Sequence, residues 1–208
     1  MKKTTIIFLF ITLFISSYTI AQYFNAGIKA GLVGSQVDGD GFAGYDKLGL
    51  DAGLFVNYQL SMRTSLQLEM EFIQKGSSHN PNVEKGDYNQ YLMRLSYLQL
   101  PLLFQYKLAK NFSVETGPAF GYLLNYYEES DQWDIISNPF RKFSFSWICG
   151  LNYAITDSWN ANFRVDYSLM GIRQKPAPGD RLIFFQYGQF NNALVISIQY
   201  IINHAKAK

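Results

Sequence analysis

Strict two-residue alternation of apolar side chains dominates this chain and constrains its fold more than any other feature. Seven segments place an apolar residue at every second position for nine to thirteen residues, and an eighth near the N-terminus does so with smaller residues. The plainest segment, 48–60, reads Leu-Gly-Leu-Asp-Ala-Gly-Leu-Phe-Val-Asn-Tyr-Gln-Leu. A side-chain period of two is that of a β-strand with one apolar face and one mostly polar face. The alternation therefore predicts an all-β protein.

The connections between these segments alternate strictly between long and short, beginning with a long one. This order is typical of an even-stranded barrel that crosses the outer membrane, with short periplasmic turns, long external loops and both termini in the periplasm. We therefore expect an eight-stranded antiparallel transmembrane β-barrel with up-and-down meander topology. Its predicted strands are 24–35, 48–60, 64–75, 95–107, 112–124, 143–155, 159–172 and 192–202, the tight turns are 61–63, 108–111 and 156–158, and the long connections are 36–47, 76–91, 125–142 and 173–190.

The first 21 residues have the organisation of a secretory signal peptide. A basic start, Met1-Lys2-Lys3, is followed by an apolar stretch over 6–15 and by the small residue Ala21 before Gln22. The apolar stretch is shorter than the roughly 20 residues that a membrane-spanning helix needs, so we expect cleavage rather than a retained helix. The predicted organisation is a signal peptide over 1–21, a barrel domain over 22–202 and a short basic C-terminal tail over 203–208.

Composition excludes several classes of function. Without Lys2 and Lys3 the 18 basic residues fall to 16, which equals the 16 acidic residues, so charge gives no reason to expect nucleic-acid binding. Charged residues make up only 16% and aromatic residues 17%, whereas soluble domains carry about 25% charged residues. Exposure to outer-membrane lipid accounts for both values. One cysteine and two histidines provide no metal site, and no cofactor is expected.

A soluble barrel of the lipocalin type shares the same alternation, because alternation alone does not say which face is inside. Such a barrel would turn its charges to water and its apolar face to a ligand. Two observations favour the membrane barrel. The polar face is rich in glycine, which suits a crowded lumen, and aromatic residues cluster at both ends of the apolar faces, as in the aromatic girdles of membrane barrels. The predicted girdle residues are Tyr58, Tyr106, Phe112, Tyr153, Trp159 and Tyr200 on the turn side, and Phe72, Tyr122 and Phe143 on the loop side.

The charges well inside the predicted strands all lie on the polar face, which is the lumen face of a membrane barrel. Because eight strands enclose only enough space for side chains, and buried charges need partners, we expect a salt-bridged plug. The alternative is an ion path for a small-solute channel. The candidate lumen network consists of Lys29, Asp51, Glu69, Glu71, Glu115, Arg164 and Asp166, with Lys75 and Lys107 on the same face.

Two of the long connections contain candidate surface sites. The connection 125–142 is acidic and aromatic, and Tyr126, Tyr127 and Trp133 are candidate anchors for a protein partner, although such residues also pack on barrel rims. The connection 76–91 contains Ser77-Ser78-His79 and, further on, Glu84 and Asp87. These are the residue types of a serine-based lipid-modifying enzyme at the outer rim, but a polar loop contains them for solvation as well. We expect no enzymatic activity.

Three segments resemble the PorT-like branch of outer-membrane β-barrel proteins. They are Tyr-Leu-Gln-Leu-Pro-Leu-Leu-Phe-Gln-Tyr at 97–106, Glu-Thr-Gly-Pro at 115–118 and the acid-containing stretch 69–76, which ends in Lys-Gly. The chain departs from the family pattern at Gln99, where an acid is common, and at its extension past Ile202. The resemblance implies an integral outer-membrane barrel with a structural or interaction role in the envelope, in some members linked to protein secretion. The expected partners are outer-membrane lipid and an envelope protein.

Overall fold

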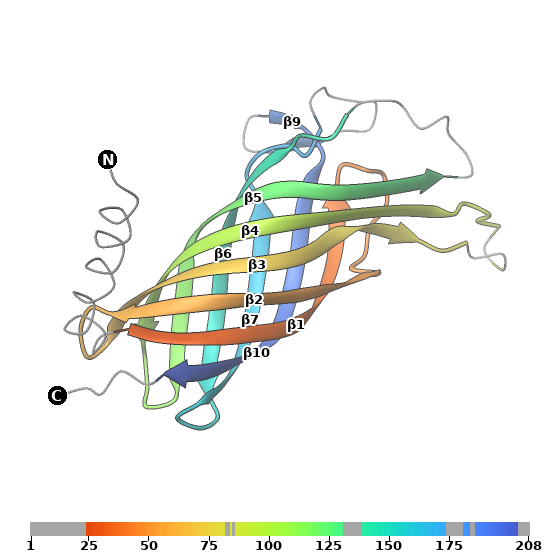
Figure 1. The fold of residues 1–208 in the computed structure, drawn as a ribbon. Coiled ribbons are helices and arrows are strands. Elements are labelled where there is room, and N and C mark those ends of the chain that lie inside the picture. The colour runs from red at the N-terminus through yellow and green to blue at the C-terminus, as the bar shows by residue number, and fades with distance from the viewer. Residues whose placement is uncertain are drawn as a thin grey trace, which may run out of the picture.

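The computed structural model describes residues 24–81, 84, 86–130, 139–173, 181–183 and 186–203. Eight strands close into one barrel in the order β1-β10-β7-β6-β5-β4-β3-β2 (Figure 1). The predicted signal peptide and residues 204–208 of the predicted tail lie outside the described residues. The barrel strands are β1 (Phe24–Asp38), β2 (Lys47–Gln59), β3 (Thr64–His79), β4 (Tyr91–Lys107), β5 (Phe112–Ser130), β6 (Phe143–Ala154), β7 (Trp159–Ser168) and β10 (Phe190–Asn203), and a separate two-stranded sheet contains β8 (Arg181–Ile183) and β9 (Gln186–Gly188).

All neighbouring strands pair antiparallel, and β1 pairs with β10 to close the barrel in a register that joins Lys29 to Gln199 and Val33 to Val195. The connections 60–63, 108–111 and 155–158 are tight and lie at the end where β1 begins and β10 ends, which we call the tight-turn end. The other end, with the long connections, is the long-loop end. The prediction of an eight-stranded antiparallel meander is therefore confirmed.

The charged face of the strands lies inside the barrel and the apolar face lies outside. In β3, Glu69 and Glu71 are 1% and 2% exposed, whereas their neighbours Leu68 and Met70 are 54% and 53% exposed. A barrel in water would bury the leucine and methionine and expose the carboxylates. This arrangement excludes the lipocalin-like alternative and matches a barrel whose outer surface contacts lipid. No helix in the described part of the chain is long and apolar enough to cross a membrane.

Aromatic side chains pair around both ends of the apolar outer surface. At the tight-turn end the rings of Trp159 and Tyr200 lie 4.7 Å apart, and Phe24 and Tyr58 lie 4.9 Å apart. Towards the long-loop end Tyr122 packs on Phe143 with ring centroids 5.4 Å apart. The two residues of each pair are cross-strand partners on adjacent strands, and their rings make contact because cross-strand partners share a face. Their two levels form the aromatic girdles that the sequence predicts.

The barrel wall is taller on one side than the sequence predicts. β3, β4 and β5 continue past β6 and β7 at the long-loop end (Figure 1), and β5 extends to Ser130 instead of ending near 124. The prediction that 125–130 begins a loop is therefore wrong. A register shift between Ser96 and Tyr97 of β4 interrupts the alternation there, so the paired segment does not show the two-residue period. β7, by contrast, ends at Ser168 rather than at 172.

Candidate functional site

The middle of the barrel interior contains a layer of buried ion pairs, and Lys29 on β1 lies at one of its two centres. Its ammonium Nζ lies 3.0 Å from Asp51 Oδ2, 3.0 Å from Glu69 Oε2 and 2.5 Å from Glu71 Oε2. The side chains of all four residues are at most 2% exposed. Three carboxylates from β2 and β3 thus converge on one cation from β1, because their alternating positions all point inwards.

Arg164 on β7 is the second centre of this layer. Its Nη1 and Nη2 donate to the two oxygens of Glu69 at 2.7 and 2.6 Å, and its Nε donates to Glu115 Oε1 at 2.5 Å. Glu71 lies 3.9 Å away. The two-point contact with Glu69 matches the planar fork of the guanidinium group. Since Glu69 contacts both Lys29 and Arg164, it connects β1, β3 and β7 across the lumen.

A third ion pair completes the layer. Lys75 Nζ lies 2.6 Å from Asp166 Oδ2, and Gln99 Nε2 donates to the same oxygen at 2.7 Å. An acid in place of Gln99 would repel this carboxylate, whereas the amide of Gln99 donates a hydrogen bond to it. The structure thus brings all seven predicted network residues inside the barrel, together with Lys75, whereas Lys107 is exposed at the tight-turn end.

Side-chain amides lie between this ion-pair layer and the tight-turn end. Gln67 Nε2 donates to Glu69 at 2.5 Å, and Asn152 and Gln105 donate to Glu115 Oε2 at 2.7 and 2.9 Å. Below these amides, at the tight-turn end, is a cavity of about 560 Å³. Gln67, Gln105 and Asn152 line the inner end of this cavity, next to the carboxylates of the ion-pair layer to which they donate.

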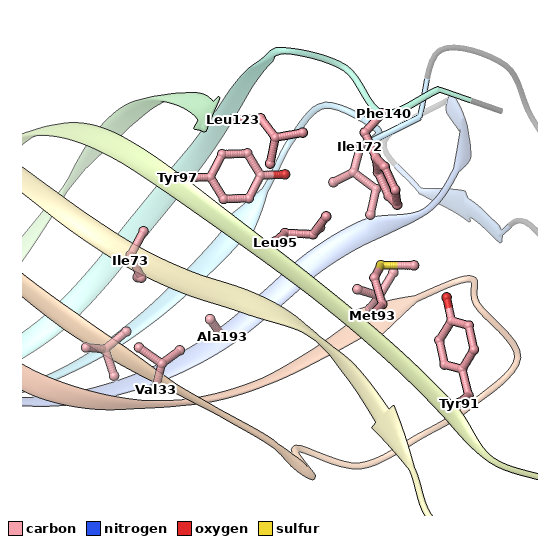
Figure 2. Packing of buried hydrophobic residues seen from close by; sticks show 12 residues of the cluster. Val33, Ile73, Tyr91, Met93, Leu95, Tyr97, Leu123, Phe140, Ile172 and Ala193 are labelled. Atoms are coloured by element: carbon pink, nitrogen blue, oxygen red, sulfur yellow. The ribbon is translucent and has the colours of Figure 1, made fainter. Parts of the chain in front are cut away.

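Buried apolar side chains fill the interior on the other side of the ion-pair layer, towards the long-loop end. Met93, Leu95 and Tyr97 project inwards from β4, and Leu123 of β5 lies beside Tyr97 (Figure 2). Each of these four residues is at most 1% exposed. The full cluster consists of Val33, Val37, Ile73, Tyr91, Met93, Leu95, Tyr97, Leu123, Phe140, Ile172, Ala193 and Val195. The interior is therefore filled by two layers of different chemistry.

Residues from the long connections cover this apolar cluster. Phe140 forms a β-bridge with Arg173, whose guanidinium lies 4.2 Å from the Phe140 ring centroid. Arg173 also forms an ion pair with Glu128 of β5, and Tyr91 donates to the same carboxylate at 2.9 Å. From the β1–β2 connection, Phe42 stacks on Tyr91 with the ring centroids 5.0 Å apart. The long-loop end is thus covered by contacts between three connections and the extended strands.

The predicted anchor residues of the 125–142 connection do not form one surface. Tyr126 pairs with the buried Leu95, so it lies on the inner face of β5, where its ring packs 5.0 Å from Phe140. Tyr127 pairs with the exposed Arg94 and lies on the outer face. Each tyrosine is about half exposed, at 52% and 50%. The third predicted anchor, Trp133, lies outside the described residues.

The serine and histidine residues of the other candidate segment do not form a catalytic arrangement. His79 Nε2 lies 2.6 Å from Asp87 Oδ2, and the ring of Phe42 stacks on the imidazole at 4.6 Å. Asn89 donates its backbone N–H to Asp87, and this hydrogen bond, with the contact to His79, lowers the pKa of the Asp87 carboxyl. Among the described residues no serine hydroxyl bonds to His79. The pair connects the end of β3 to the β3–β4 connection.

The apolar layer was missing from the sequence prediction. At the long-loop end of β4 the apolar Met93, Leu95 and Tyr97 point inwards and the charged Arg94 points outwards, whereas Leu98 and Leu100, beyond the register shift, point outwards. The sequence pattern that could have indicated this layer is the segment 91–97, where apolar residues no longer keep to the lipid-facing positions of the strand. On its own this pattern does not reveal whether the second apolar face contacts a core, lipid or a partner.

The chain matches one protein-family model and is similar to several solved structures. The family model described as an outer membrane protein β-barrel domain matches residues 16–174. Similar solved structures include Ail, the attachment invasion locus protein of Yersinia pestis, at 12% identity with 86% of this chain and 98% of Ail covered and a TM-score of 0.46. Neisserial surface protein A matches at 9% identity, 86% and 96% coverage and a TM-score of 0.48. OprG of Pseudomonas aeruginosa matches at 13% identity, 86% and 91% coverage and a TM-score of 0.38. A search of characterised protein sequences found no significant match.

Proposed function

Because the chain belongs to the outer-membrane β-barrel domain family, and is therefore a protein of the bacterial outer membrane, we propose that it works there as a closed, non-conducting barrel that binds an envelope protein. The filled interior is the observation that carries this proposal. Buried ion pairs and a packed apolar cluster occupy successive layers of the lumen. In the part of the chain that the structure describes, both layers are built from buried side chains, which supports a role in binding over one in solute passage.

The proposed orientation puts the tight-turn end and both termini in the periplasm and the long loops outside the cell. Short periplasmic turns and long external loops are the rule for bacterial barrels. In this orientation the extension of β3, β4 and β5 projects from the membrane on the outer side. Its outward-facing residues include Tyr127, Arg94 and Glu129, and Tyr127 donates to Glu129 at 2.6 Å. An exposed aromatic residue beside charged groups is typical of protein-binding surfaces.

The likeness to PorT-like proteins supports a finer version of this proposal, in which the partner belongs to a protein-secretion system. The segment 97–106 that carries the likeness is the part of β4 that supplies Tyr97, Gln99 and Leu103 to the interior. The resemblance therefore concerns residues that fill the lumen and shape the barrel. We propose no enzymatic activity, since the His79–Asp87 pair is accounted for as a contact between loop and strand.

Photo-crosslinking in intact cells tests the proposed partner surface. A photoreactive amino acid at Tyr127 is expected to give a discrete protein adduct, because this position faces outwards on the extension. The same group at Phe163, an outward-facing residue of β7 that is 41% exposed in the apolar band, is expected to label lipid only. If positions 94, 127 and 129 all give no protein adduct while the barrel is inserted normally, the proposed binding role is wrong.

A further inference from the structure

The cavity at the tight-turn end has the size of a small-ligand binding site and is open at one end. Its volume of about 560 Å³ falls within the range of about 300–1,000 Å³ that small-ligand pockets occupy. Its inner end is closed by Gln67, Gln105 and Asn152, whose amide hydrogens already bond to the carboxylates of the ion-pair layer. A molecule that enters from the tight-turn end therefore stops there and does not pass through.

The walls of the cavity are rich in side-chain amides. An Asn or Gln side chain offers a carbonyl acceptor and an N–H donor, the same two groups that a peptide bond offers. One of these amides, Gln199, is 2% exposed, and its Nε2 donates to no acceptor among the described residues. The amide-bearing residues that line the cavity are Asn25, Asn57, Gln59, Gln67, Gln105, Asn111, Asn152, Asn160 and Gln199.

The mouth of the cavity is positively charged. Arg63, Lys107 and Lys110 line it with a single carboxylate, Asp157. All four side chains are exposed, and none of them forms an ion pair with another residue in the described part of the chain. Three cations and one anion give the mouth a net charge of +2. This local excess attracts acidic groups.

Two apolar residues of the tight turns also line the cavity. Met62 is 93% exposed and Ile155 is 53% exposed. They provide contact area for apolar side chains of a ligand, which a carbohydrate lacks. The mouth thus combines positive charge, apolar contact area and amide hydrogen-bonding groups leading inwards.

We propose that the tight-turn cavity binds an extended acidic peptide segment of another protein. The backbone of the peptide accepts a hydrogen bond from Gln199 Nε2 and donates to amide oxygens of the wall, its carboxylates lie against Lys107, Lys110 and Arg63, and its apolar side chains contact Met62 and Ile155. This site is at the opposite end of the barrel from the extension of β3, β4 and β5. The proposal is therefore independent of a partner at Tyr127.

Calorimetric titration of the purified barrel in a non-ionic detergent at low salt tests this site directly. The probes are a capped acidic pentapeptide, Asp-Leu-Glu-Ala-Glu, the matched basic peptide Lys-Leu-Lys-Ala-Lys, and a tetrasaccharide of galacturonic acid as an acidic carbohydrate. The acidic peptide is expected to bind with a submillimolar Kd that weakens as salt is added. The basic peptide and the tetrasaccharide are expected to show no saturable binding under the same conditions.

Variants at the two ends of the barrel identify the site. Lys107→Gln with Lys110→Gln removes two exposed cations at the mouth and is expected to weaken acidic-peptide binding at least fivefold, since a charge pair near a surface contributes about 1 kcal/mol or more. Gln199→Met removes the unpaired donor and is expected to weaken binding by a similar factor. The matched control Lys142→Gln, an exposed cation at the long-loop end, leaves the Kd within twofold.

Three results would overturn the proposal: no saturable binding of the acidic peptide to the intact barrel, equal binding of the basic peptide, or tighter binding of the acidic tetrasaccharide. An unchanged Kd in the double lysine variant would also contradict it, because both side chains are exposed and their replacement leaves the fold intact. Channel currents or crosslinks at Tyr127 bear on the proposed function and leave this result unaffected.

Discussion

At the scale of residues, the ion-pair layer is the part of the interior that depends most on individual side chains. Which charges point inwards could be predicted, because Glu69, Glu71 and Asp166 all lie on the polar face of their strands. Which charges pair could not, because Arg164 contacts Glu69 across 95 positions of sequence. That contact depends on the curvature and stagger of the closed barrel, which alternation alone does not specify.

Replacing Arg164 tests how much the layer contributes to stability. Arg164→Ala leaves Glu69 and Glu115 without their guanidinium partner in a buried site, and removing one partner of a buried pair costs about 3–5 kcal/mol. The free energy of unfolding, measured by urea titration of the lipid-reconstituted barrel, is expected to fall by this amount. Lys107→Ala, which removes an exposed cation at the tight-turn end, serves as the control and should change it by less than about 0.5 kcal/mol.

The contact between His79 and Asp87 gives a pH dependence with a defined sign. The backbone N–H of Asn89 and the His79 ring hold the pKa of Asp87 below its usual value, which is about 3.9 in an unfolded chain. The stabilisation that this carboxylate provides is therefore complete above about pH 4 and is lost as the pH falls through the lower folded-state pKa.

Hydrogen-exchange protection of the Asn89 amide measures this effect. The protection factor is expected to stay constant from pH 7 to about pH 4 and to fall only below that range, whereas Asp87→Ala should already lack the protection at pH 7. A loss of protection between pH 7 and pH 5 would show that another group controls this loop.

At the scale of elements, the extension of β3, β4 and β5 is the feature that most separates the structure from the sequence prediction. The eight strands and their order follow from alternation and connection length. The extra residues of β5 could not be predicted, because 125–130 lack the two-residue period and are rich in acidic and aromatic side chains. Backbone pairing with 91–96 extends the strand despite this composition. Two-residue alternation in the sequence therefore predicts the part of a strand that contacts lipid. It does not predict the part of the strand that extends beyond the apolar band.

Gly76 is required for the pairing of β3 with β4 near this extension. Its φ of 143° is a conformation that residues with side chains rarely adopt, and a Cβ here would lie 2.0 Å from the carbonyl oxygen of Met93. Gly76→Ala is therefore expected to lower the free energy of unfolding by about 1–3 kcal/mol from backbone strain and by about 1–3 kcal/mol more from overlap with its neighbour.

Gly41→Ala separates the two contributions. Gly41 has a φ of 91°, but a Cβ there would meet nothing within 4 Å, so this variant tests strain without overlap. Equal destabilisation by the two substitutions would show that the close contact with Met93 does not limit the packing of β4 on β3.

At the scale of the whole molecule, the barrel is closed by two layers that differ in chemistry. The ion-pair layer lies next to the cavity at the tight-turn end. The apolar cluster fills the lumen towards the long-loop end (Figure 2). The sequence predicts the first layer through its inward charges and misses the second. Apolar residues such as Val33 and Leu95 point into a lumen that is expected to be polar, and no local pattern distinguishes them from residues facing lipid.

Electrical recording from the purified wild-type protein in planar lipid bilayers tests the closed barrel most directly. Folding of the barrel is verified first by the faster migration of the unboiled protein on a gel. An absence of current can then be attributed to a closed barrel and not to an unfolded protein. The two filled layers predict that the inserted barrel gives no discrete conductance steps in symmetric salt at either polarity. Reproducible unitary steps from the unmodified protein would contradict the account and would favour a small-solute channel instead.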